Sequence, residues 1–168
     1  MLGPVIIDTN VLIDLFNGLD EARRELRYHR DVVISLITWI ELMTAYEARR
    51  AAGVLDMADL EVANLAMRSF PVLGIDTRTM IEASKIRGRS VYQKKKLALP
   101  DAIIQATANT TKRILVTRNT KDFDINSPRI RVPYLAEITS VTPNAAVNLF
   151  TPPSKLRVSI TYIALPPN

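Results

Sequence analysis

The sequence predicts an α/β fold, a three-layer α/β/α sandwich around a central and mainly parallel sheet. Short runs of β-branched and aliphatic residues recur along the chain, and stretches with apolar residues at helical spacing separate them. Strands that alternate with amphipathic helices form β-α-β units, which place parallel strands in one sheet with helices on its faces. The 168 residues, 48% hydrophobic and 23% charged, suit one globular domain with a single core.

The first unit of this fold occupies the N-terminal part of the chain. A β-branched run at 5–7 indicates a buried strand, and helical spacing follows at 11–16 until Asn17 and Gly18 stop it. A charged surface helix is expected at 20–30. A second buried strand at 32–35 completes the unit.

Two helices are expected next, and the first has the clearest apolar face. Thr38 opens this helix, which runs to residue 50 before Gly53. Its apolar side chains recur at the i, i+3, i+4, i+7 spacing, namely Trp39, Leu42, Met43 and Tyr46. The second helix covers 55–69. Most of these apolar residues are expected to be core.

Three further strands and two helices complete the predicted sheet. Gly88 is expected to end one of the helices, and Pro100 lies where the first turn of the other favours proline. The strands are expected at 70–75, 113–117 and 130–133, and the helices at 77–87 and 101–110.

The C-terminal segment has a different composition. Five of the ten prolines fall beyond residue 142, and Val158, Ile160, Tyr162 and Ala164 alternate with more polar residues. We therefore divide the chain into a compact domain at 1–133 and a proline-rich extension at 134–168. The extension is expected to be either an edge strand or an accessory tail.

Composition excludes several kinds of site. The chain has no cysteine and a single histidine, His29, which rules out disulfide scaffolds, zinc-thiolate sites and cysteine nucleophiles and leaves too few imidazoles for a histidine metal site. Asp8 and Asp14 interrupt the N-terminal apolar stretch, and no apolar run approaches the roughly 18 residues of a membrane span. We expect a soluble, cytoplasmic protein without a membrane partner. Its net charge of +5 favours polyanionic partners where the basic residues cluster.

Acidic residues follow the predicted strands at the edge where open parallel sheets bind ligands. Asp8 ends the first strand, Glu41 lies one turn beyond the second, Asp101 lies in the first turn of the helix before the fourth, and Asp122 follows the fourth. Each has a purely structural alternative: an Asx-turn for Asp8, a capping box with Thr38 for Glu41, the helix dipole for Asp101, and an ordinary loop for Asp122 and Asp124.

Together these acids predict a metal site. Four carboxylates at one edge would repel one another unless a cation neutralised them. Oxygen ligands without histidine or cysteine favour Mg²⁺ or Mn²⁺ over zinc. Phosphoryl hydrolysis with two metals needs such a cluster, because the ions activate and align a water molecule and stabilise the leaving oxygen.

Four segments of the chain carry a further signal, namely IIDTNVLID at 6–14, SLITWIEL at 35–42, LPDAIIQATA at 99–108 and LVTRNTKDF at 115–123. In this order they resemble the PIN-domain ribonucleases and most of all the VapC toxins of toxin-antitoxin pairs, and the match covers about residues 4–133. The resemblance places the catalytic and metal-binding acids at Asp8, Glu41, Asp101 and Asp122, with Asp124 as the alternative fourth acid. It places Asn10, Thr117 and Asn119 around the site, while Asp14 and Asp76 are expected to be surface or capping residues.

The resemblance implies a Mg²⁺- or Mn²⁺-dependent endoribonuclease that leaves 5′-phosphate and 3′-hydroxyl ends. It also implies a homodimer and a cognate antitoxin whose helix or extended segment binds an apolar groove in the region of residues 38–69. The sequence alone does not separate groove from core there.

Basic residues are expected to hold the RNA backbone. Between Ala83 and Pro100 the charged residues are all basic, and Arg118 and Lys121 flank the acidic loop. We expect phosphate contacts, with an affinity that falls as salt rises, from Arg118, Lys121, Lys94, Lys95 and Lys96. Tyr92, beside these lysines, is expected either to stack on a base or to pack within the domain.

Other functions are weighed against this one. The principal alternative is a catalytically inert PIN-like module that binds RNA or protein, and a dead site has no need to keep four mutually repulsive acids. A receiver-type phosphoacceptor domain would need a lysine after its last strand, and a serine hydrolase would need a G-x-S-x-G motif; the sequence supports neither. DNA as substrate stays open, because acids and basic residues do not distinguish the two sugars.

Overall fold

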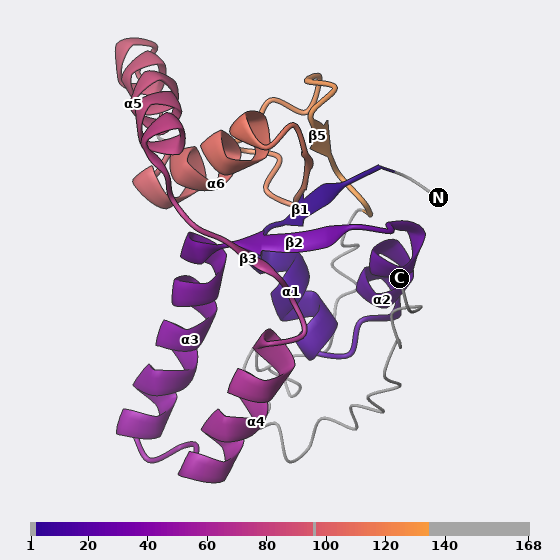
Figure 1. Ribbon diagram of the computed structural model, residues 1–168. Coiled ribbons are helices and arrows are strands. Elements are labelled where there is room, and N and C mark those ends of the chain that lie inside the picture. The colour runs from indigo at the N-terminus through magenta and orange to yellow at the C-terminus, as the bar shows by residue number, and fades with distance from the viewer. Residues whose placement is uncertain (1–2, 96, 135–168) are drawn as a thin grey trace, which may run out of the picture.

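The computed structural model describes residues 3–95 and 97–134, which form a three-layer α/β/α sandwich, as the sequence predicts (Figure 1). The sheet has five strands in the order β3-β2-β1-β4-β5, and every neighbouring pair is parallel. The strands are β1 (Val5–Ile7), β2 (Val32–Ser35), β3 (Val72–Leu73), β4 (Ile114–Val116) and β5 (Ile130–Arg131). The helices are α1 (Thr9–Phe16), α2 (Asp20–Tyr28), α3 (Leu36–Ala51), α4 (Met57–Met67), α5 (Thr77–Tyr92) and α6 (Leu99–Thr110).

Alternation along β1 divides the core between the two faces of the sheet. Ile6 points into a cluster with residues of α5 and α6, whereas Val5 and Ile7 join a cluster with residues of α1, α3 and α4. Figure 1 shows α5 and α6 on one side of the sheet and α1, α3 and α4 on the other. Because β1 is central and parallel, both of its faces are buried, and its carboxyl end carries the chain directly into α1.

The apolar stripe of α3 is mostly core. Leu42 and Met43 are buried, and Trp39 and Tyr46 pack against the same cluster. The apolar side chains that stay exposed on α3 and α4 are others, namely Ile40, Met57, Val62 and Leu65.

Most helix boundaries differ from those expected by one to five residues, and two of the differences have a clear local cause. Helix α3 begins at Leu36 rather than Thr38, because the Ser35 hydroxyl accepts a hydrogen bond from the Thr38 amide at 2.9 Å and caps the helix. Helix α5 continues through Gly88 to Tyr92 and ends where Lys94 takes a left-handed backbone conformation at φ 56°. A glycine that keeps helical angles does not stop a helix, so its presence at position 88 was a misleading signal.

Helix α2 is less exposed than its charged sequence indicates. Glu25 and His29 are buried, and Arg131 of β5 binds both carboxylate oxygens of Glu25, at 2.5 and 2.9 Å. His29 donates from Nε2 to the same carboxylate at 2.8 Å. The contacts attach α2 to the edge strand β5.

The edge strand or tail expected within 134–168 lies outside the described residues, apart from Tyr134. Among the helices that the structure describes, none combines the length and apolar character that crossing a membrane requires.

Candidate active site

Asp8 lies at the junction of β1 and α1, where it is buried at 3% exposure and caps the helix. Its Oδ1 accepts a hydrogen bond from the Thr9 amide at 2.7 Å. Its Oδ2 accepts from the Thr117 hydroxyl and from Asn10 Nδ2, both at 2.6 Å. Burial raises the pKa of Asp8 and the charge of Glu41 adds to the rise, while the bonds from Thr117 and Thr9 oppose it.

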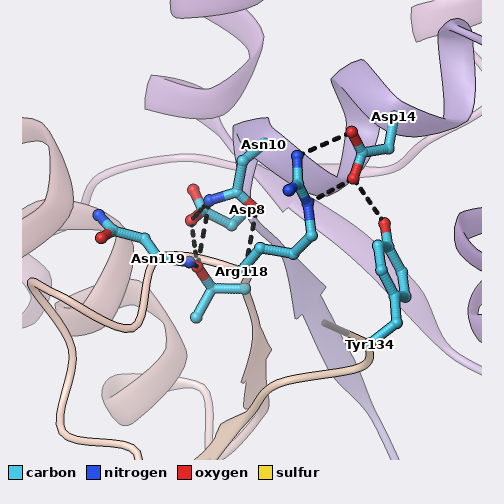
Figure 2. Close-up of polar contacts among 7 residues, drawn as sticks. Asp8, Asn10, Asp14, Arg118, Asn119 and Tyr134 are labelled. Atoms are coloured by element: carbon cyan, nitrogen blue, oxygen red, sulfur yellow. Dashed lines mark hydrogen bonds and ion pairs between the residues drawn. The ribbon is translucent and has the colours of Figure 1, made fainter. Parts of the chain in front are cut away.

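The residues around Asp8 connect β4 to the start of α1 (Figure 2). Besides its bond to Asp8, the Thr117 hydroxyl accepts from the Asn119 amide at 2.9 Å and from Asn10 Nδ2 at 3.2 Å. Asn10 Oδ1 accepts from the backbone amide of Arg118 at 3.0 Å. Asn10, Thr117 and Asn119, which the sequence predicts around the first acid, therefore belong to one hydrogen-bonded group.

Glu41 lies in α3 and is oriented by α1. The Thr9 hydroxyl donates to Glu41 Oε2 at 2.5 Å. The capping box considered for Thr38 and Glu41 is wrong, because Ser35 caps the helix instead. Glu41 is therefore directed toward the Asp8 junction rather than toward its own helix terminus.

Asp101 lies in the first turn of α6, and its pKa depends on the charges of the other acids. Its pKa is raised to about 6, first by burial and then by the charges of Asp8, Asp122 and Glu41. One electrostatic environment therefore includes carboxylates from β1–α1, α3, α6 and the loop after β4. The parallel topology brings them together, because these segments meet at the carboxyl edge of the sheet.

The loop after β4 contains two acids with different surroundings. Asp122 Oδ2 accepts from Asn119 Nδ2 at 2.7 Å, and the Asp122 amide donates back to Asn119 Oδ1 at 3.3 Å. Asp124 instead accepts from the amide of Asn126 at 3.1 Å and closes a local turn. Asp122 is among the charges that raise the pKa of Asp101.

The donor set fits a hard divalent cation. All four acids offer carboxylate oxygens, and the mutual repulsion that raises the pKa of Asp101 is what a cation would relieve. Within 3–95 and 97–134, no three side chains of Asp, Glu, His or Cys lie close enough together to hold a metal ion as they stand. The arrangement therefore fits such an ion in charge and donor type.

The basic segment before α6 is attached to the end of α5. The buried Ser90 hydroxyl donates to the Lys95 carbonyl at 3.0 Å and accepts from the Leu97 amide at 3.2 Å. Lys94 and Lys95 are exposed, Tyr92 is 89% exposed, and Lys96 lies outside the described residues. The segment leads directly into the helix that carries Asp101, and Lys121 is exposed on the loop of Asp122.

Sequence reasoning missed the environment of Asp14. This carboxylate is 8% exposed, so its assignment as a surface or capping residue is wrong, whereas Asp76 does cap α5. Arg118 forms an ion pair with Asp14, and the Tyr134 hydroxyl donates to Asp14 Oδ2 at 2.8 Å (Figure 2). The only local signal is the i, i+4 spacing of Asn10 and Asp14, which places both on one face of α1.

Comparisons with known proteins agree on one kind of domain. A family model described as the PIN domain matches residues 5–126. A toxin-antitoxin complex from Klebsiella pneumoniae contains a chain that is 36% identical, with 78% of this chain and 98% of that chain covered at a TM-score of 0.63. No curated protein matches the sequence.

Two further solved structures share the fold. One is FitAcB from Neisseria gonorrhoeae, at 24% identity and a TM-score of 0.59, with 71% of this chain and 90% of that chain covered. The other is DNA-bound VapBC from Salmonella typhimurium, at 24% identity and a TM-score of 0.64, with 77% and 98% covered.

Proposed function

The chain belongs to the PIN domain family and is VapC-like, and from this premise we propose that it is a toxin that hydrolyses RNA with Mg²⁺ or Mn²⁺. One observation carries the proposal: acids from four separate segments share one electrostatic environment at the carboxyl edge of the sheet. Such a concentration of carboxylates destabilises a fold unless it binds a cation. An inert binding module has no use for it.

In this mechanism Asp8 and Asp101 would hold the central ion, and Glu41 and Asp122 would complete its coordination or hold a second ion. A divalent ion, when bound, supplies water activation and neutralises charge on the leaving oxygen. Thr9 orients Glu41, and Thr117 and Asn10 orient Asp8 through the hydrogen bonds that they donate. Water attacks phosphorus, the bond to O3′ breaks, and the products are a 5′-phosphate and a 3′-hydroxyl.

The partners follow from the same premise. The similar chain from Klebsiella pneumoniae belongs to a toxin-antitoxin complex, so we propose a cognate antitoxin for this chain as well. Exposed apolar side chains on α3 and α4 supply surface that such a partner can bury. We further propose a homodimer that acts in the cytoplasm, where RNA is the substrate.

The activity is tested by incubating the purified protein with single-stranded and structured RNA and with matched DNA. We expect RNA cleavage with Mg²⁺ or Mn²⁺, none in EDTA, and 5′-phosphate ends on the products. Cleavage that persists in EDTA contradicts the metal mechanism, and cleavage of DNA alone contradicts the substrate class. Metal binding without cleavage of any nucleic acid favours the inert module.

The basic segment before α6 contributes phosphate contacts in this proposal, through Lys94, Lys95 and Lys96, with Lys121 on the opposite loop. The Lys94→Glu variant is expected to weaken RNA binding and to lower the slope of log affinity against log salt by about one. The measurement is RNA binding in EDTA at several salt concentrations.

The matched control for this variant is Lys112→Glu. Lys112 is also exposed and also has a left-handed backbone conformation, at φ 58°, but it follows the C-terminal end of α6. The control is expected to keep the wild-type salt slope. Equal slopes for Lys94→Glu and wild type would exclude the phosphate contact.

A further inference from the structure

Asp14 is a buried carboxylate that the mechanism above does not use. Arg118 Nη2 donates to its Oδ1 at 2.8 Å, and Arg118 Nε and the Tyr134 hydroxyl both contact Oδ2. The guanidinium lies 5.9 Å from the centre of the Tyr134 ring. A two-point ion pair of this kind offsets the desolvation of both charges only while both partners stay in place.

Arg118 is attached to α1 at two points. Its backbone amide donates to Asn10 Oδ1 at 3.0 Å, and its side chain reaches Asp14, four residues further along the same helix face. Figure 2 shows the side chain running from the end of β4 to Asp14, with Tyr134 beside it and bound to the same carboxylate. The guanidinium is thus engaged within the chain, in contrast to the phosphate contact that the sequence predicts for Arg118.

The bond from the Arg118 amide fixes the orientation of the Asn10 carboxamide, and the ion pair with Asp14 holds Arg118 against α1. A backbone amide can donate only to the oxygen of that group, so the bond from Arg118 directs Nδ2 toward Asp8 Oδ2, at 2.6 Å, and toward Thr117 Oγ1, at 3.2 Å. If the loop at Arg118 moved away from α1, the carboxamide could rotate. Asp8 Oδ2 would then lose one of its two donors.

We propose that Asp14 and Arg118, supported by Tyr134, are positioning residues that hold the Asn10 carboxamide and, through it, the Asp8 carboxylate in the orientation that binds the metal. The inference rests on the proposed function for the role of Asp8. The ion pair between Asp14 and Arg118 thereby has a role in metal affinity rather than in contact with RNA.

The test compares Asp14→Asn, Arg118→Gln and the double variant in two measurements. In a Mn²⁺ titration without RNA, each single variant is expected to bind Mn²⁺ about ten-fold more weakly, as is common when partners of metal ligands are lost. The double variant should be no weaker than the worse single variant, because both remove one interaction. In RNA cleavage, kcat is expected to fall while KM and the salt slope stay unchanged.

A direct phosphate contact predicts a different pattern. Arg118→Gln would then raise KM and lower the salt slope by about one, and Asp14→Asn, by releasing the guanidinium, would strengthen RNA binding. Mn²⁺ affinity would stay at the wild-type value in both variants. That result would overturn the positioning role.

Two controls separate positioning from loss of stability. Leu60→Ala removes a buried side chain of α4 and is expected to lower the melting temperature while leaving Mn²⁺ affinity unchanged at temperatures well below it. Arg118→Lys keeps the positive charge and is expected to restore part of the Mn²⁺ affinity that Arg118→Gln loses. If Leu60→Ala also binds Mn²⁺ more weakly, loss of stability is enough to explain the weaker binding of the other variants, and the proposal is contradicted.

A spectroscopic measurement makes the test independent of nuclease activity. The side-chain amide signals of Asn10 in an NMR spectrum of the metal-free protein are expected to shift in Asp14→Asn and to stay in place in Leu60→Ala. An unmoved Asn10 signal in Asp14→Asn overturns the inference even if RNA is cleaved. If the wild type cleaves no RNA, the proposed function fails, and the Asn10 signal still decides the positioning role.

Discussion

We expect Asp8→Asn to abolish the proposed RNA cleavage and to leave the protein folded. The substitution removes the charge of the most buried acid of the site, and Asp101 keeps its place in α6. Loss of a single preorganised electrostatic contact in an active site lowers the rate by about 100- to 1,000-fold, and loss of a metal ligand should do at least as much. The measurement is Mn²⁺-dependent cleavage of a defined RNA by wild type and variant purified in the same way.

The stability of Asp8→Asn follows from two opposing effects. The asparagine is uncharged, so it avoids the burial and the repulsion from Glu41 that raise the pKa of Asp8. Its amide nitrogen faces a donor, however, whichever way the side chain turns, because both carboxylate oxygens of Asp8 accept hydrogen bonds. We expect an unfolding midpoint in EDTA within a few degrees of wild type, a change of about 1 kcal/mol in either direction.

The control for Asp8→Asn is Asp20→Asn, the same change at an exposed acid of α2 that pairs with Arg23. It is expected to keep full activity, since exposed pairs contribute little to stability. Asp8→Asn with wild-type cleavage rates would contradict the assignment of the metal site. A variant that unfolds would instead point to a structural role for the carboxylate.

We expect Arg131→Met to destabilise the protein by about 3 kcal/mol at pH 7, because it leaves the Glu25 carboxylate buried without its main partner. Glu25 is 4% exposed, and after the substitution only His29 still contacts it among the residues that bind it here. Chemical denaturation at pH 7 measures the change. Methionine keeps the apolar stem of the arginine, so little of the loss is due to packing.

The pH dependence of this effect identifies its cause. Burial raises the pKa of Glu25, but the hydrogen bonds and charges of Arg131 and His29 outweigh it, so the folded pKa lies below the ordinary value of 4.5. In wild type the stabilisation is therefore present above pH 4.5 and is lost as the pH falls through the folded pKa. In Arg131→Met the contribution of Arg131 that lowers this pKa is gone while burial still raises it, so we expect the stabilisation above pH 4.5 to shrink or to reverse. The difference between the two proteins should be largest at neutral pH and should shrink in acid.

A neighbouring arginine provides the control. Arg129 is exposed, and Arg129→Met is expected to leave stability within about 0.5 kcal/mol of wild type at every pH. A loss of stability by Arg131→Met that is the same at pH 4 and pH 7 would contradict the buried ion pair as its origin.

The elements of the sheet could be predicted from the sequence because they depend on local pattern. The central strand β1 is a short β-branched run, and the acid that ends it is at once the cap of α1 and the first residue of the site. Boundaries were predicted less well where a single side chain decides them. Ser35 rather than Thr38 caps α3, and the turn at Lys94 rather than Gly88 ends α5.

The candidate acids could also be identified from the sequence, since each follows a predicted strand or lies near the start of a helix next to one. What the sequence left open was which interactions those side chains make. Glu41 had a local partner in Thr38, but the structure gives it Thr9, 32 residues away. Asp122 and Asp124 were alternatives for the fourth acid, and only the folded loop separates their surroundings.

The sequence by itself determined the alternation of strands and helices and the order in which four acids come to one edge, because periodicity and parallel topology are enough for both. The tertiary structure alone decided the pairs between Asp14 and Arg118, 104 residues apart, and between Glu25 and Arg131, 106 residues apart. Isolated charges at such separations resemble ordinary surface residues in a sequence. They become partners only when β4 pairs with β1 and β5 pairs with β4, which brings each arginine against an acid of the N-terminal unit.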